Sequence, residues 1–296
     1  MLGKVLPPKN DEVFLALFSN PENKERVLVP FLKCILKLPN MVPNDVQILD
    51  PRLHIGREDE KHPIVDALIE TPEGFIHIEM QYRDYEHIRE RVVYYHSRLL
   101  GDQLPQGHGY NELKRTISLL ITDFPLIEEE PNYFNRYVFM NPSTHTVFSD
   151  ISEIDTLELL KLPDASDGSP EWIWGSYING EKEEDFMRLA EAYPEVQSAV
   201  KALYELSADQ ALRMRADAIE KARRDEEDWR NTLLKKGFAQ GIEEGIKEGL
   251  EEGREEAKTE MVRNLLNAGI PVDVVARAAA VSIDKVNEWA ATKKYD

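Results

Sequence analysis

One stretch of the chain, residues 64–81, limits the fold most strongly because its residues alternate as in a β-hairpin. Apolar side chains occupy every second position of its two arms, namely Val65, Ala67, Ile69, Ile76, Ile78 and Met80. Alternation with a period of two is typical of strands with one buried face. The segment Thr71-Pro72-Glu73-Gly74 has turn chemistry, since Pro fixes φ and Gly is conformationally free. The stretch therefore predicts two antiparallel strands joined by a tight turn.

Three polar residues of this hairpin, Asp66, Glu79 and Gln81, are expected on its other face. If the loop is centred on Pro72 and Glu73, Asp66 lies opposite Glu79, and Gln81 follows two residues further on the same side. Facing carboxylates have Cβ atoms about 4.5–5.5 Å apart and repel each other. A hard cation such as Mg²⁺ removes the repulsion because both groups can bind it. A loop of odd length would instead put the two acids on opposite faces.

The same polar residues also fit a hairpin that carries no site. A strand face in contact with water carries Asp, Glu, His and Gln simply because it is solvated. His77 shares this face and fits a solvated position better than a catalytic one. The residue pattern leaves a metal site and a plain solvated face both open.

Several segments occur in a distinctive order along the chain. They are an opening helical segment at 9–18, the tripeptide Glu79-Met80-Gln81, the segment 91–95, Tyr110, the apolar strand 117–121 and a glycine-spaced C-terminal helix. In this order they resemble the PD-(D/E)XK nuclease superfamily, specifically its Rpn branch of recombination-promoting nucleases, also called transposases. In that branch Gln commonly takes the superfamily's lysine position, as Gln81 does here. One departure is that Val65, not Pro, precedes Asp66, although Pro63 is close by.

The resemblance implies an α/β fold with a restriction-endonuclease-like mixed sheet core flanked by helices, followed by a long C-terminal helical extension. It also implies DNA cleavage that depends on Mg²⁺, with Mn²⁺ as an alternative, in recombination or mobile-element biology. Asp66 and Glu79 are then the catalytic metal ligands, and Gln81 orients the water or a phosphate oxygen. Asp11 or Glu12, on the opening helix, is the candidate for a further metal-binding carboxylate, and Asp11 is preferred.

The charge of the chain argues against strong DNA binding. Its net charge is −19, whereas nonspecific affinity for nucleic acids comes from Lys and Arg that neutralise phosphates. Cations do gather just after the hairpin, namely Arg83, Arg89, Arg91, Arg98, Lys114 and Arg115. In this segment Arg91 and Tyr95 are candidate substrate-binding residues, with ordinary helix-surface roles as the alternative. We expect DNA binding that is weak and falls steeply with salt.

The remaining patterns predict strands mixed with helices, which gives an α/β or α+β core. Helical spacing predicts helices over 11–38 and 85–100, and from 181 to the C-terminus. Further strands are expected at 47–54, 116–122, 135–140 and 144–148, and residues 157–163 are expected to close the core. Trp172, Trp174 and Tyr177 are expected to be packing aromatics.

Five glycines recur at every fourth position of the C-terminal helix, namely Gly237, Gly241, Gly245, Gly249 and Gly253. Each costs a helix about 1 kcal/mol relative to Ala, so the stripe requires an explanation. Close approach of another helix is one, and the surrounding glutamates exclude a membrane span. We expect a homodimer through the C-terminal helices, and an unpaired flexible arm is the alternative.

Three parts are therefore predicted: a nuclease-like domain with packing helices at 1–208, a charged glycine-spaced arm at 209–260 and a small helical module at 261–296. The helices and turns predicted in this module are similar in arrangement to a DNA-binding helix-turn-helix, but the module has few cations. Packing or dimerisation is therefore the better interpretation. A lone Cys34 fits a reducing cytoplasm. The chain shows no apolar run long enough for a signal peptide or a membrane helix, so we expect a cytoplasmic protein with no membrane partner.

Two functions remain after other chemistries are set aside. The seven histidines lack the spacing of a zinc site, and the chain has neither a phosphate-binding loop nor a nucleophile elbow. The first function is a metal-dependent DNA endonuclease. The second is a catalytically weak interaction or assembly protein on a nuclease fold.

Overall fold

The computed structural model describes residues 5–49, 66–104 and 107–291. The chain divides into two compact units, Met1–Lys221 and Ala222–Asp296. Ile64 and Val65 of the predicted hairpin and residues 50–54 of the predicted strand 47–54 lie outside the described residues.

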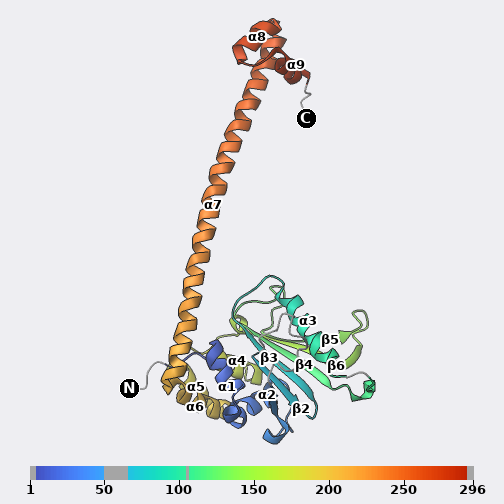
Figure 1. The fold of residues 1–296 in the computed structure, drawn as a ribbon, viewed down its shortest axis with the longest axis vertical. Coiled ribbons are helices and arrows are strands. Elements are labelled where there is room, and N and C mark those ends of the chain that lie inside the picture. Colours follow the sequence, from blue (N-terminus) through green and yellow to red (C-terminus); the bar gives the residue numbers. More distant parts are fainter. Residues whose placement is uncertain (1–4, 50–65, 105–106, 292–296) are drawn as a thin grey trace. The chain divides into compact units, whose positions relative to one another are not determined.

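A mixed six-stranded sheet forms the first unit, in the order β1-β2-β3-β4-β6-β5 (Figure 1). Its strands are β1 Gln47–Leu49, β2 Ala67–Thr71, β3 Gly74–Gln81, β4 Arg115–Thr122, β5 Phe134–Met140 and β6 Val147–Glu158. β4 runs parallel to both β3 and β6, and the other neighbours are antiparallel. The predicted α/β class with a mixed sheet is confirmed.

The hairpin of β2 and β3 has the predicted even register. Its pairs run from Ala67 with Ile78 to Thr71 with Gly74. Gly74 closes the turn at φ +152°, and a Cβ there would lie 1.9 Å from the carbonyl oxygen of Arg115. Only glycine therefore allows β3 to start this close to β4.

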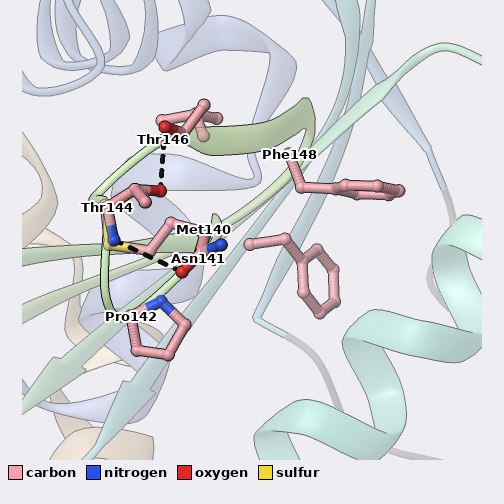
Figure 2. Close-up of a pocket in the computed structure, with 8 residues that line it drawn as sticks. Met140, Asn141, Pro142, Thr144, Thr146 and Phe148 are labelled. Carbon is pink, nitrogen blue, oxygen red and sulfur yellow. Dashed lines mark hydrogen bonds between the residues drawn. The ribbon is translucent and has the colours of Figure 1, made fainter.

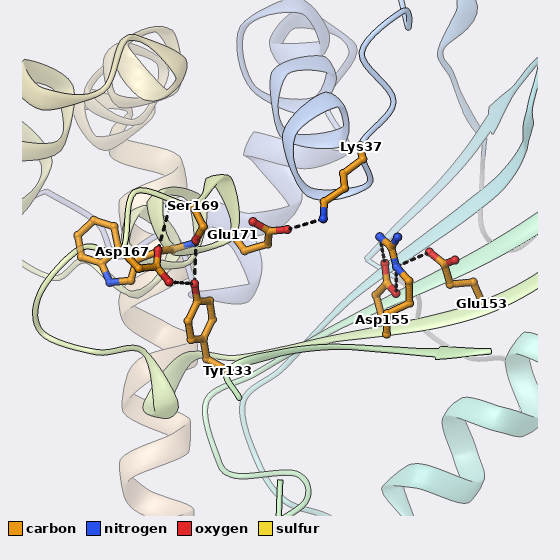
Figure 3. A network of polar contacts seen from close by, with 9 residues as sticks. Lys37, Tyr133, Glu153, Asp155, Asp167, Ser169 and Glu171 are labelled. Atoms are coloured by element: carbon orange, nitrogen blue, oxygen red, sulfur yellow. Dashed lines mark hydrogen bonds and ion pairs between the residues drawn. The ribbon is translucent and has the colours of Figure 1, made fainter. Parts of the chain in front are cut away.

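β6 is longer than predicted. It continues through Leu157 to Glu158, although residues 157–163 were expected to form a separate closing segment. Residues 149–156, between the strand expected at 144–148 and this segment, were not assigned, and they include Glu153 and Asp155. Figure 3 labels both acids, Glu153 and Asp155. They are buried in the strand because arginines pair with them: Arg115 lies 2.6 Å from Glu153, and Arg136 lies 3.2 Å from Asp155.

One face of the sheet packs on the main hydrophobic core. The surrounding helices are α1 Asp11–Phe18, α2 Val29–Ile35, α4 Pro170–Asn179, α5 Glu183–Ala192 and α6 Pro194–Ala208. A π-helical turn, Lys24–Leu28, leads into α2, so the predicted pair of helices over 11–38 is present with an added irregular turn. Trp172, Trp174 and Tyr177 are buried in this core, as predicted.

The opposite face of the sheet is covered by α3, Ile88–Gly101 (Figure 1). The helix was predicted to begin at residue 85 and begins three residues later. Ile88, Val92 and His96 are its buried residues. Because α3 lies against this face, the polar side of the hairpin is not open to water.

The long helix α7, Gln210–Asn267, begins in the first unit. Leu212 and Ala216 belong to the main core, and Asn10 donates its side-chain amide to the carbonyl oxygen of Ala216 at 3.3 Å. In the second unit, the end of α7 packs with α8 Val272–Ala279 and α9 Ile283–Ala291 around Val262, Val275, Val286 and Trp289. Within the described ranges, no helix is both long enough and apolar enough to span a membrane.

Candidate active site

Asp66 stands immediately before β2 and is fixed by two hydrogen bonds. Its Oδ2 accepts from the backbone N–H of Met80 at 2.6 Å, and its backbone carbonyl accepts from the hydroxyl of Ser19 after α1. The ladder pairs Ala67 with Ile78, so one further step places Asp66 beside Glu79. The side chain is therefore anchored to the strand that carries the second acid.

Glu79 lies in β3 with only 4% of its surface exposed. Its Oε1 accepts a hydrogen bond from Nη2 of Arg91 at 2.7 Å, and the Arg91 guanidinium lies 5.9 Å from the centre of the Tyr95 ring. Of the two residues predicted to bind substrate, Arg91 thus contacts the acidic pair directly, and Tyr95 lies against Arg91. Contact of Arg91 or Tyr95 with a substrate remains a prediction.

The pKa values of both acids, Asp66 and Glu79, are raised above their ordinary values. Burial raises the pKa of Asp66 to about 7, and the negative charges of Glu79 and Asp11 contribute to the rise, while the Met80 N–H and Arg91 oppose it. Burial also raises the pKa of Glu79, and Arg91 opposes that shift. Arg91 is the positive charge that opposes both shifts, so one arginine faces two carboxylates and a bound cation would relieve the pair.

Asp66 and Glu79 are the residues that fit a divalent metal ion best, because hard cations prefer carboxylate oxygens. Asp11 is the first residue of α1, and its charge reaches Asp66. Among the described residues, however, no group of three His, Cys, Asp or Glu side chains is arranged to hold a metal. The chain therefore brings together a pair of acids, with Asp11 nearby as a further charge.

Gln81 is the last residue of β3 and is 9% exposed. Its backbone carbonyl accepts a hydrogen bond from the N–H of Asp123 at 3.0 Å, which ties the end of β3 to the segment after β4. Alternation along β3 puts its side chain on the same face as Glu79. Its role in orienting water or a phosphate oxygen remains a prediction.

The expected solvation of the polar face is wrong. His77 is 4% exposed, as buried as Glu79, because α3 covers this side of the sheet. Burial lowers the pKa of His77 to about 4, so the ring is neutral near pH 7. From the sequence, His77 was expected to be exposed to water, whereas its ring is buried and neutral.

The buried polar residues around His77 were not predicted from the sequence. Ser118 contacts the His77 ring, and His96 and Ser152 continue the contacts beyond Ser118. The ring of His96 lies between the two serine hydroxyls, at 2.8 Å from Ser118 and 2.7 Å from Ser152. A weak signal existed, since Ser118 is the single polar residue in the apolar run 117–121.

Two other features of the unit do not fit hydrolytic chemistry. Glu153 and Asp155 form a second acidic pair (Figure 3), but two arginines face it: Arg136 lies within 3.2 Å of both acids, and Arg115 lies 2.6 Å from Glu153. An open hollow at the end of the β5–β6 hairpin lies among Phe139, Met140 and Phe148 (Figure 2). None of the residues that line it is ionisable.

The fold, with Asp66 immediately before β2 and Glu79 in β3, defines a nuclease-like α/β domain. The sequence model of the PD-(D/E)XK nuclease family transposases matches residues 8–232, and the chain belongs to this family. The match contains all the candidate residues and the beginning of α7. No curated protein and no solved structure matches the chain significantly.

Proposed function

We propose that the protein is a Mg²⁺-dependent endonuclease that hydrolyses phosphodiester bonds of DNA. The observation that carries the proposal is the placement of Asp66 against β3 beside Glu79, with too little positive charge to balance the two acids. Family membership supports nuclease chemistry at this pair.

The roles of the residues follow from their chemistry. Asp66 and Glu79 would hold the ion, and Asp11 adds negative charge that strengthens its attraction. When bound, the divalent ion supplies Lewis acidity that polarises the scissile phosphate. Gln81 is neutral and cannot take up a proton as a general base, so its role is to orient water or a phosphate oxygen by hydrogen bonds. Arg91 fixes Glu79 in position and offers its remaining N–H groups to the phosphate backbone.

A plasmid-nicking assay tests the proposal. Wild-type protein with Mg²⁺ is compared with Asp66→Asn and Glu79→Gln, which keep the side-chain shapes, and with Glu90→Gln as an exposed control on α3. We expect both site variants to lose about 100-fold or more of the rate and the control to keep it. Equal nicking by all four proteins would assign the activity to a contaminant.

We propose DNA as the partner and expect its binding to be weak and sensitive to salt. Most cations near the site already pair with acids: Arg91 with Glu79, Lys114 with Glu70 and Arg115 with Glu153. Binding to phosphates has to compete with these pairs, so affinity should fall steeply between low and physiological salt. A role in recombination and a cytoplasmic location remain predictions from the sequence.

A second candidate function is assembly through the C-terminal helices. Large apolar side chains follow four of the glycines on α7 and are 57–77% exposed, namely Phe238, Ile242, Ile246 and Leu250. A continuous apolar stripe of this kind is typical of an interaction surface. The proposed partner is a second copy of the chain.

Sedimentation of the full-length protein tests this assembly. The variant Ile242→Glu/Ile246→Glu places charge on the stripe, and Lys247→Glu is the control on the same helix. A dimeric wild type and control with a monomeric double variant would support the homodimer. An unchanged mass in the double variant would exclude this stripe as the contact.

A further inference from the structure

Four buried polar side chains form a continuous chain beneath α3. Ser152 on β6 contacts Nε2 of His96 at 2.7 Å, and Nδ1 of the same ring contacts Ser118 on β4 at 2.8 Å. The Ser118 hydroxyl lies 3.5 Å from Nδ1 of His77 on β3. None of the four residues is more than 4% exposed. The chain crosses three neighbouring strands in the interior of the domain.

The chain ends at the acidic pair. Nε2 of His77 lies 3.8 Å from Oε2 of Glu79, and this nitrogen is buried without a hydrogen-bond partner. Arg91 occupies the other oxygen, Oε1. A buried ring nitrogen without a partner is unfavourable, and the carboxylate oxygen is an acceptor within a short movement of it.

The chemistry of the four groups gives the chain a direction. A neutral imidazole has one N–H donor and one bare nitrogen that accepts. Facing a carboxylate, His77 carries its proton on Nε2, so its Nδ1 accepts from the Ser118 hydroxyl. Ser118 in turn accepts from Nδ1–H of His96, whose Nε2 accepts from the Ser152 hydroxyl. Every donor then points toward Glu79.

We propose that Ser152, His96, Ser118 and His77 form a one-way hydrogen-bond chain that fixes the His77 tautomer and orients the Glu79 carboxylate. His77 is thus a positioning residue, because it acts on the reaction only through Glu79. Residues that hydrogen-bond to a metal-binding side chain orient that side chain, and they commonly affect the affinity of the site for the metal. The link to the metal depends on the proposed function, whereas the direction of the chain does not.

Nitrogen NMR of the full-length protein, labelled with ¹⁵N in histidine, tests the direction. The His77 signals are assigned by their loss in His77→Gln. We expect Nε2–H for His77 and Nδ1–H for His96 at neutral pH. A His77 ring protonated on Nδ1, or exchanging between tautomers, would overturn the chain. This result is independent of any metal or nuclease activity.

Calorimetric titration with Mn²⁺ tests the positioning. His77→Gln keeps an N–H donor near the position of Nε2, and His77→Met fills the space without a donor. We expect the Met variant to bind Mn²⁺ about tenfold more weakly or worse, and the Gln variant to stay within about threefold of wild type. Equal affinity in all three proteins, or equal loss in both variants, would refute positioning by hydrogen bonding.

Circular dichroism and thermal unfolding of both variants show whether they are folded. A wild-type protein that binds no Mn²⁺ would instead refute the proposed function and the metal-positioning role together. The tautomer measurement would still decide whether the hydrogen-bond chain exists.

Discussion

Arg91 and Glu79 are joined between α3 and β3 by a hydrogen bond of 2.7 Å between Nη2 and Oε1. The contact places a positive charge on a carboxylate that is 4% exposed. It also connects the helix that covers the polar face to the strand that carries the acids. The pair therefore links the stability of the domain to the arrangement of its site.

Replacing this arginine by a neutral side chain should destabilise the fold. We expect Arg91→Met to lower the free energy of unfolding by about 1–3 kcal/mol at neutral pH, because Glu79 is left buried without its donor. Urea denaturation measures the loss, with the exposed Arg89→Met as control. In the double variant Arg91→Met/Glu79→Gln, the loss should be smaller than the sum of the two single losses.

Metal affinity should depend on pH through Asp66. Its pKa of about 7 means that the metal-free site binds a proton that a cation must displace. Below pH 7, Mn²⁺ affinity should therefore rise about tenfold with each unit of increasing pH, and above pH 7 it should level off. Calorimetry at several pH values measures this. An affinity that is constant between pH 5.5 and 8 would contradict the assignment of Asp66 as a ligand.

Asp66 should also make the metal-free fold less stable as pH rises. The folded-state pKa of Asp66 is raised from 3.8, so the folded protein binds the proton more tightly than the unfolded chain. The stabilisation is fully present below about pH 4 and is lost as pH rises through about 7. The free energy of unfolding of Asp66→Asn, taken relative to that of wild type, should therefore increase as the pH rises from acidic to neutral. A constant difference between the two unfolding curves would argue against the shift.

His96 should make the domain sensitive to acid. Burial lowers its pKa to about 4 from 6.5, so the unfolded chain takes up the proton first. Stability from this group is present above about pH 6.5 and is lost as pH falls toward 4. Between pH 7 and 5, wild type should lose about 1–2 kcal/mol more than His96→Gln. Chemical denaturation at the two pH values provides the measurement, and equal losses would contradict the prediction.

Gly74 should tolerate no larger residue. A Cβ at this position would meet the Arg115 carbonyl at 1.9 Å, so β3 or β4 would have to move. We expect Gly74→Ala to destabilise the domain by about 2–3 kcal/mol or more. Gly107→Ala is a control, because it also has a positive φ but has open space around its added Cβ. Thermal unfolding is measured for both variants. Gly107→Ala gives the cost of a side chain at positive φ, and the additional loss in Gly74→Ala gives the cost of the clash with Arg115.

The register of the hairpin could be predicted because its determinants are local. Thr71 and Gly74 bound a two-residue turn, and the turn fixes which residues of the arms face each other. The pairing of Asp66 with Glu79 follows from the same few residues. Local sequence therefore specifies the position of the acids along the strands.

The burial of the polar face could not be predicted, because it depends on distant partners. His77 resembles a solvated strand residue until α3 is placed over it and Ser118 is brought alongside. β6 was predicted too short for a similar reason. Glu153 resembles a loop residue unless Arg115, 38 positions earlier, neutralises it. For the hairpin the alternation was predicted correctly and the burial was not, whereas the continuation of β6 beyond residue 148 was not predicted.

The order in which the chain is synthesised has a consequence for this site. Asp66 and Met80 are 14 residues apart, and Arg91 and Glu79 are 12 apart, whereas His96 and Ser152 are 56 apart. Contacts between near neighbours close with less loss of entropy than distant ones. During translation, the acids can thus meet before the ribosome has made β6. A nascent or truncated chain would carry them without the contact between His96 and Ser152, so the candidate site would be fully ordered only after most of the domain has emerged.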